Sequence, residues 1–142
     1  MKSFGSIMYF TKERNNELLK AYKKVIKSVS QIRLKEIGVM VVNSPAPRFW
    51  VSEERATTVI SSMLKGKDVL SSMRQSKREM FQEIYRRVIE LRKLKKYRSQ
   101  TLSSVVFAVV NSPAPKFYMK ASSAIEILFK VRNGYYERIG KY

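Results

Sequence analysis

The chain contains no histidine and no cysteine. Without cysteine there are no disulfide bonds, thiolate metal sites or cysteine nucleophiles, and without histidine the commonest general base and metal ligand are missing. Acidic residues are scarce as well, because only 11 of the 142 residues are aspartate or glutamate. Enzymes that transfer phosphoryl groups or cleave nucleic acids need several carboxylates to hold metal ions. We therefore expect a protein that is not an enzyme and has no metal site and no cofactor.

Long apolar runs are also missing. No run approaches the about 20 apolar residues that a helix needs to span a bilayer. The N-terminal sequence MKSFGSIMYFTKER has neither the apolar stretch nor the cleavage site of a secretory signal. The sequence accordingly predicts a cytoplasmic protein with no membrane partner.

Positive charge is present in large excess. The chain has 29 lysines and arginines and a net charge of +18, and 44% of its residues are hydrophobic, which is enough for a core. A folded domain with such a charge favours an anionic partner, and nucleic acid is the usual one. We expect a non-catalytic accessory or architectural factor, with a homo-oligomer or larger assembly among its possible states, that contacts the phosphates of nucleic acid, with DNA favoured over RNA. An RNA-binding accessory protein, or a virion or packaging protein that forms a homo-oligomer or larger assembly, is the alternative.

One short motif occurs twice. The residues VVNSPAP occupy Val41–Pro47 and Val109–Pro115, at an offset of 68. Upstream, AYKKVI at position 21 resembles IYRRVI at position 84, an offset of 63, so the second copy has five extra residues between the two blocks. Two matching blocks in the same order indicate an internal duplication. We expect a first repeat over residues 1–75 and a second over 76–142.

Both repeats are expected to be all-α. Their apolar residues recur at i, i+3, i+4 and i+7, the helical period. The predicted order in each repeat is helix, helix, proline-rich linker and helix, and the two repeats would be pseudo-symmetric and packed into one small basic domain. The predicted helices lie at Thr11–Ser28, Leu34–Val41 and Ser52–Gly66 in the first repeat, and at Ser76–Lys96, Leu102–Val109 and from Ser123 onward in the second.

The second helix of each repeat has an alternative. Its valine runs also suit a strand, so that the segment IGVMVVNSPAPRFWVS could form a β-hairpin. The helical period occurs in both copies and strict alternation does not, which favours the helix. Pro45 and Pro113 then end it, and Ala46 and Ala114, each between two prolines, should be extended.

The start of the third helix differs between the copies. Ser52 is a good N-cap, and Glu53 and Glu54 complement the positive helix end. Lys120 replaces this serine in the second copy, so we expect the start to move to Ser123, where a glutamate three residues on has capping-box spacing. Residues 133–142 are expected to form a tail.

The basic residues provide the candidate contacts to nucleic acid. Seven cations lie within the thirteen residues 86–98, in the last part of the second repeat's first helix and just after it. They are too many for the few nearby acids to neutralise, although a solvated helix face is the alternative. The motif SPAP[RK]F[WY] places a cation and two aromatic rings before a helix N-terminus, which suits phosphate binding and base stacking. We expect its phenylalanines, Phe49 and Phe117, to be in the core. The candidates are Arg48, Trp50, Arg55, Lys65, Arg86, Arg87, Arg92, Lys93, Lys95, Lys96, Arg98, Lys116, Tyr118 and Lys120.

The order of a helix, a sharp break and a second helix with a polar N-terminal face resembles that of tandem helix-turn-helix proteins. The resemblance is one of architecture and implies binding of DNA. The usual turn has about 3–4 residues and often contains glycine, whereas roughly eight residues with two prolines intervene in this sequence.

Overall fold

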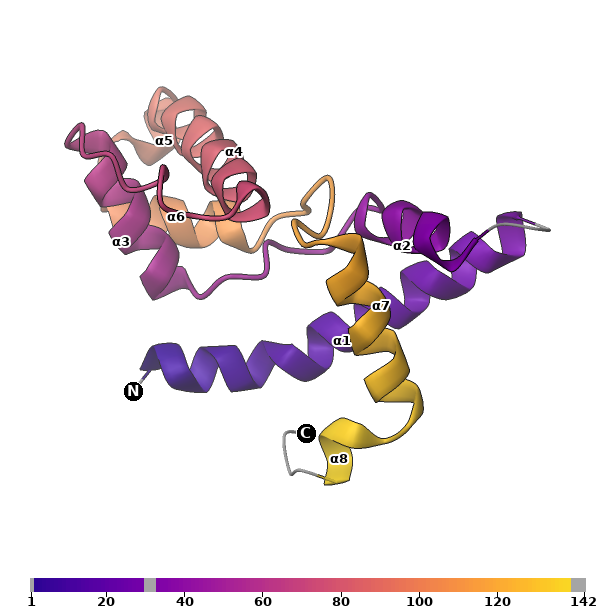
Figure 1. Ribbon diagram of the computed structural model, residues 1–142. Coiled ribbons are helices and arrows are strands. Elements are labelled where there is room, and N and C mark those ends of the chain that lie inside the picture. Colours follow the sequence, from indigo (N-terminus) through magenta and orange to yellow (C-terminus); the bar gives the residue numbers. More distant parts are fainter. Residues whose placement is uncertain (1, 30–32, 139–142) are drawn as a thin grey trace.

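The computed structural model describes residues 2–29 and 33–138, with side chains from residue 10 onward (Figure 1). All of the regular structure in these ranges is helical, which confirms the all-α prediction. The helices are α1 (Lys2–Ser28), α2 (Leu34–Val42), α3 (Glu53–Leu64), α4 (Gln75–Arg92), α5 (Lys95–Arg98), α6 (Leu102–Val110), α7 (Ala121–Arg132) and α8 (Tyr135–Arg138). In the described residues, no helix is long and apolar enough to cross a membrane.

The helices pack in two lobes, and the chain passes from one lobe to the other after α2 and back again after α6 (Figure 1). Helix α3 packs on α6 and α4, whereas α7 packs on α2 and α1. Figure 1 shows α3, α4, α5 and α6 together on one side, and α2, α7 and much of α1 on the other. Helix α3 thus packs on helices that follow it rather than folding back on α2, so the α2–α3 segment does not adopt the helix-turn-helix arrangement.

Two extended segments cross between the lobes. The backbone amide of Ala46 donates to the carbonyl of Ala114 at 3.0 Å, and Ala114 donates back at 2.8 Å. On either side of this bridge, Phe49 N–H donates to Val110 at 3.0 Å and Phe117 N–H donates to Val42 at 2.9 Å. Both alanines are extended, as predicted. The preceding segments are helices, so the hairpin alternative is wrong.

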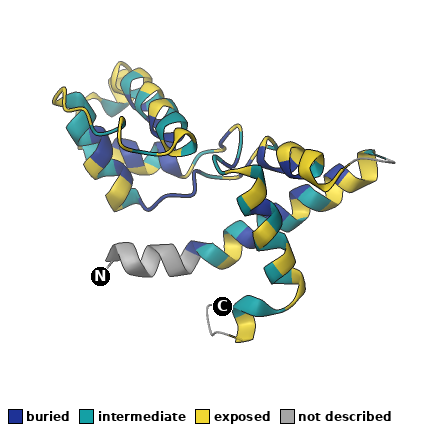
Figure 2. Ribbon diagram, viewed as in Figure 1, coloured by how far each residue is buried: buried dark blue, intermediate teal, exposed yellow. Residues whose placement is uncertain are grey.

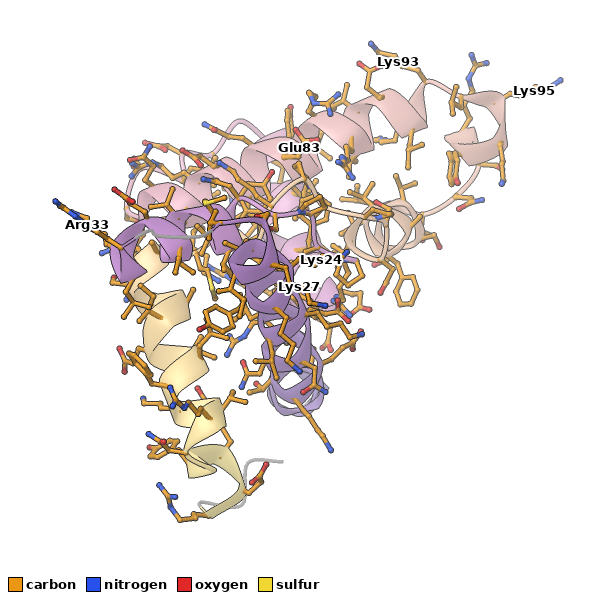
Figure 3. The ribbon with its side chains drawn as sticks, turned by 90° about the vertical axis from the view of Figure 1, so that its right-hand side faces the viewer. Lys24, Lys27, Arg33, Glu83, Lys93 and Lys95 are labelled. Atoms are coloured by element: carbon orange, nitrogen blue, oxygen red, sulfur yellow. The ribbon has the colours of Figure 1, made fainter. Side chains whose placement is uncertain are left out.

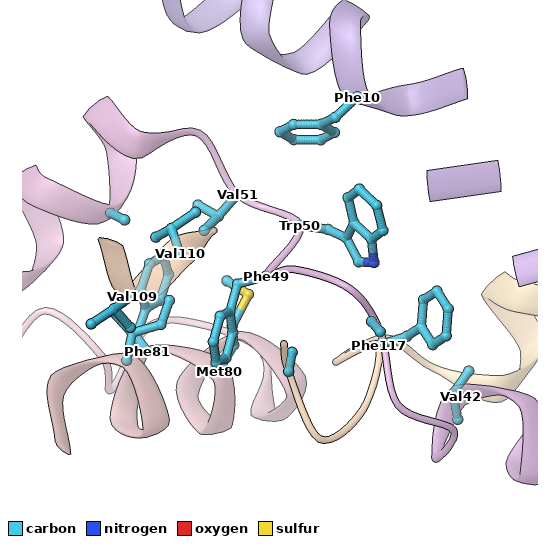
Figure 4. Close-up of a cluster of buried hydrophobic side chains, with 14 of the residues drawn as sticks. Phe10, Val42, Phe49, Trp50, Val51, Met80, Phe81, Val109, Val110 and Phe117 are labelled. Atoms are coloured by element: carbon cyan, nitrogen blue, oxygen red, sulfur yellow. The ribbon is translucent and has the colours of Figure 1, made fainter. Parts of the chain in front are cut away.

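The core lies on both sides of this crossing (Figures 2 and 4). Phe49 is completely buried and packs near Met80 and Phe81 of α4, while Phe117 is buried on the other side. The prediction that these two phenylalanines belong to the core is confirmed. Each ring belongs to a linker rather than to a helix. The prolines keep the linkers extended where they cross between the lobes, and this places both rings in the core.

Several predicted helix ends are confirmed and others are wrong. The Ser52 hydroxyl accepts a hydrogen bond from the Arg55 amide at 3.1 Å, so it is the N-cap of α3. Helix α7 begins at Ala121 rather than Ser123, because its first turn packs closely on Gly38 of α2. The expected helix over 76–96 ends at residue 92, because Leu94 has an extended backbone with ψ of 139°. The expected tail contains α8, and residues 139–142 lie outside the described residues.

Candidate anion-binding site

A cavity of about 590 Å³ opens between α1, α3, α4, α7 and the two linkers. We call it the central cavity. Its lining combines basic, hydroxyl and apolar side chains. The basic ones are Arg14, Arg55, Arg74, Lys77 and Lys120, the hydroxyls include those of Ser72, Ser76 and Ser123, and the apolar and aromatic ones include Trp50, Met80, Phe81, Phe117, Tyr118, Met119 and Ile127.

No aspartate or glutamate is among the described residues that line the central cavity. Five cations from four separate parts of the chain therefore converge without a carboxylate between them. The Arg14 guanidinium donates to the buried Asn15 amide oxygen at 3.0 and 3.2 Å, which fixes its position through a neutral partner. Like charges brought together in this way repel each other, and an anion in the cavity would relieve the repulsion.

Lys77 shows the effect of this crowding. Partial burial of its ammonium, together with the charges of Arg55, Arg14 and Arg74, lowers its pKa below the ordinary value of 10.5. Burial and like charge both disfavour the protonated lysine. Without a ligand, the lining of the central cavity therefore carries positive charge that no lining carboxylate balances.

Two helix N-termini border the central cavity and add to its positive potential. Arg74 is the N-cap of α4 and Lys120 is the N-cap of α7, and neither side chain caps its helix. Arginine and lysine side chains only donate hydrogen bonds, so they cannot accept from the free amides of the first turn. These amides, and the positive ends of the helix dipoles, remain available to an anion.

The structure brings four of the sequence-predicted residues to the central cavity, in two different environments. Arg55 and Lys120 are exposed at its rim. Trp50 is only 7% exposed and lies between the rings of Phe10 and Phe117, at 6.0 and 6.4 Å between centroids (Figure 4). The predicted stacking of Trp50 on a base requires an accessible ring face, and this burial leaves little of the ring accessible.

Tyr118 occupies the position in the second linker that corresponds to Trp50. It is half-buried and stacks on Phe49, with ring centroids 5.8 Å apart and an interplanar angle of 19°. Burial raises the pKa of its phenol. Its φ of 56° lies in the left-handed region, which is unusual for an aromatic residue and marks local backbone strain.

Arg48 and Lys116 have partners inside the protein. The Arg48 guanidinium donates to the carbonyls of Phe49 at 2.9 Å and Val51 at 2.8 Å. The Lys116 ammonium forms an ion pair with Glu79 at 2.9 Å, which lowers the pKa of that carboxyl. The contacts of these two cations hold the linkers in place, so neither is a leading candidate for direct contact with an anion.

Arg86 and Arg87 share the carboxylate of Glu83, with N–O distances of 2.6 and 2.7 Å. Hydrogen bonds from both arginines, with that of Arg86 dominant, lower the pKa of Glu83. Arg87 also donates to the Pro113 carbonyl at 2.8 Å. It therefore ties α4 to the second linker.

The remaining candidates lie away from the central cavity. Lys65 is exposed at the C-terminal end of α3, and Lys93 pairs with Glu90 at 3.4 Å. Figure 3 shows Lys93 and Lys95 projecting at one end of the molecule, apart from Lys24 and Lys27 of α1. We call the exposed cations at that end the α4–α5 patch, which consists of Arg92, Lys93, Lys95, Lys96 and Arg98.

Sequence reasoning missed three of the five cavity cations, namely Arg14, Arg74 and Lys77. Arg14 lies 60 residues before Arg74, and neither belongs to a dense run of charge. The sequence contained only a weak indication of these cations. Arg74 and Lys77 lie three residues apart at the start of a helix, where acidic residues are usually preferred.

No family model, curated protein or solved structure matched the chain. The chemistry of the central cavity therefore has to be inferred from the side chains themselves.

Proposed function

We propose that this protein binds nucleic acid without catalysing a reaction, with DNA favoured over RNA, and that the central cavity takes a phosphate. The observation that carries the proposal is the convergence of Arg14, Arg55, Arg74, Lys77 and Lys120 on one cavity whose described lining contains no carboxylate. A nucleic acid supplies the missing negative charge, and its phosphates suit arginine, lysine and helix N-termini.

The α4–α5 patch supports a polymeric anion rather than an isolated one. Its five cations are exposed, and only Lys93 has an ion pair with an acid in the described residues. The central cavity and the patch are separate clusters on one small molecule. A chain of phosphates could occupy both, whereas a small anion would occupy one.

We also infer that the chain is a duplicated unit whose third helices have been exchanged. The two bridging hydrogen bonds from Phe49 and Phe117 have acceptors Val110 and Val42, and both donors and acceptors are 68 residues apart. At the other offset of 63, Arg14 of α1 corresponds to Lys77 of α4. Both line the central cavity. On this proposal the cavity lies where the two repeats meet, so that one ligand contacts both copies.

The test compares two variants of equal charge by fluorescence anisotropy with a labelled duplex. The cavity variant R55Q/K77Q/K120Q neutralises three lining cations, and the control K35Q/K67Q/R132Q neutralises three exposed cations that do not line the cavity. We expect the cavity variant to lose about tenfold or more in affinity and the control to lose about threefold or less. Equal losses would mean that net charge alone drives binding and would overturn the role of the cavity.

Salt and a competitor complete the test. We expect the wild-type affinity for duplex to fall steeply between about 50 and 200 mM salt, because bound phosphates release counterions. Affinity that is independent of salt, or the absence of any binding at low salt, would overturn the proposed function. Structured RNA that displaces the duplex at lower concentration than unlabelled duplex would reverse the preference for DNA.

A further inference from the structure

The central cavity is lined partly by cations and partly by apolar and aromatic side chains, and a lone phosphate would bind only to the cations. Its cations lie beside an apolar and aromatic surface that includes Met80, Phe81, Tyr118, Met119 and Ile127. A site for a lone phosphate needs donors and charge but gains nothing from such a surface. An apolar wall next to a cationic rim is complementary to a ligand that is itself divided into an apolar part and an anionic part.

The volume sets a limit on the size of this ligand. About 590 Å³ falls within the range of roughly 300–1,000 Å³ that is typical of small-molecule sites. A single nucleotide is of that size. A base-paired duplex, whose major groove alone is about 12 Å wide, can present a backbone phosphate to the basic rim of such a cavity, but its stacked bases cannot enter it.

We propose that the central cavity binds one unpaired nucleotide, with its phosphate on the basic rim and its base against the wall formed by Tyr118 and the methionines. This inference rests on the proposed function and specifies it: the preferred nucleic acid would have a single-stranded end or a nucleotide displaced from its stack. Unpaired bases stack on aromatic side chains with little dependence on sequence. The ligand class is thus a nucleoside 5′-phosphate, free or as part of a strand.

The lining offers a position for each part of that ligand. Arg74 and Lys77 at the start of α4, and Lys120 at the start of α7, add side-chain donors to the free amides of two helix N-termini. Ser76 and Ser123 lie in the same first turns and provide hydroxyls for phosphate or ribose oxygens. Tyr118 is half-buried and lines the cavity; Phe49 stacks on its ring and the Lys116 ammonium lies 5.3 Å from the ring centroid, so a base would contact the part of the ring that these two neighbours leave exposed.

The experiment uses the intrinsic fluorescence of the full chain, because its only tryptophan, Trp50, lines the central cavity. Adenosine 5′-monophosphate, adenosine and inorganic phosphate are titrated separately at low salt. We expect saturable change with adenosine 5′-monophosphate at a concentration at least about tenfold lower than with either of the other two, since only the nucleotide engages both walls. Equal potency of inorganic phosphate would reduce the site to a phosphate site and overturn the inference.

Two variants test the contributions of the aromatic and the cationic lining separately. Tyr118→Gly removes the ring while suiting the backbone φ of 56°, and it should weaken nucleotide binding by about tenfold and leave phosphate binding unchanged. Lys77→Gln should weaken both. A Tyr118→Gly variant that binds nucleotide as the wild type does would overturn the stacking role. Circular dichroism checks that each variant is folded.

A second measurement does not depend on any variant. The wild-type chain is titrated with a labelled blunt duplex and with the same duplex carrying a three-nucleotide single-stranded extension. We expect the extended duplex to bind at least about fivefold more tightly. If both bind equally and no nucleotide binds, the inference fails while the proposed function stands. If neither duplex binds, the proposed function itself fails.

Discussion

Arg14 and Lys77 lie 63 residues apart in the sequence and line the same cavity, where the charge of Arg14 helps to lower the pKa of Lys77. The described residues that line the central cavity include no aspartate or glutamate. The two positive charges repel each other, and an anion bound beside them would offset this repulsion. We therefore expect the charge of Lys77 to lower the stability of the unliganded protein, most clearly at low salt, where screening is weak.

Replacing Lys77 with glutamine should therefore raise the melting temperature of the unliganded protein at low salt. Phosphate or sulfate should raise the melting temperature of the wild type more than that of K77Q, because a ligand that binds only the folded state stabilises it. Differential scanning fluorimetry at increasing phosphate concentration measures both effects. Lys35→Gln, on the exposed side of α2, is the control. An equal response of K77Q and K35Q would contradict the expectation.

The same lysine gives a pH dependence of defined sign. The pKa of Lys77 is lower in the folded chain than the unfolded value near 10.5. Between these two values the unfolded chain binds more protons, so the free energy of unfolding should rise as pH is raised through this window. Chemical denaturation of the wild type and K77Q at several alkaline pH values isolates the contribution of Lys77. The difference between them should shrink as pH rises.

Glu83→Gln should destabilise the fold by about 1 kcal/mol at neutral pH, since the carboxylate pairs with both Arg86 and Arg87. The pKa of Glu83 is lowered from 4.5, so this contribution is present above that value and is lost as pH falls through the folded pKa. Urea denaturation at pH 7 and at a series of pH values below 4.5 tests this. Glu90→Gln, whose partner Lys93 is fully on the surface, should cost less. An E83Q deficit that does not shrink as the pH is lowered would contradict the expectation.

Arg48→Gln should reduce stability by about 1–3 kcal/mol and leave duplex affinity nearly unchanged. The guanidinium donates two hydrogen bonds to linker carbonyls; without it the Val51 carbonyl loses this donor, and the Phe49 carbonyl keeps only the Val51 amide. Urea denaturation gives the first quantity and anisotropy the second. If Arg48→Gln bound the duplex much more weakly and was as stable as the wild type, Arg48 would be a direct contact to the anion after all.

Gly38→Ala tests the close contact between α2 and α7. An added Cβ would lie 2.7 Å from Ile125 Cδ1 and 3.1 Å from the Ala121 carbonyl oxygen. Overpacking of about 1–3 kcal/mol should exceed the roughly 1 kcal/mol that alanine gains over glycine in a helix. We expect a net loss of stability in thermal unfolding, partly restored in the double variant G38A/I125V. A G38A variant more stable than the wild type would show that the contact is loose.

The sequence predicted individual helices well and their partners poorly. The valine runs formed helices because a 3.6-residue period places one face of α2 and α6 in the core, and Ser52 capped α3 through purely local chemistry. The packing of α3 on α4 and α6, and of α7 on α1 and α2, was not predictable, because an extended linker of given length can place a helix in either lobe. Local signals set each helix, whereas the pairing depends on which apolar faces fit.

The same difference between local signals and tertiary packing explains which residues of the candidate site were predicted. Dense charge runs were visible in the sequence, yet Arg86, Arg87 and Lys93 pair with acids one helical turn away. Arg14 and Lys77 carried no such signal, because only tertiary packing brings α1 beside the start of α4. Trp50 could equally have been exposed or buried until its neighbours Phe10 and Phe117 were placed.

The crossing of the two linkers also has a consequence for biosynthesis. Helices α1 and α2 obtain their packing partner α7 only when residues 121–132 are available, nearly the whole chain after α1 begins. A ribosome that adds about 5–20 residues per second would hold the nascent α1–α2 pair with an uncovered apolar face for several seconds. The partners of α3, helices α4 and α6, are synthesised before α7, so the lobe of α3, α4 and α6 should be the first to mature during translation.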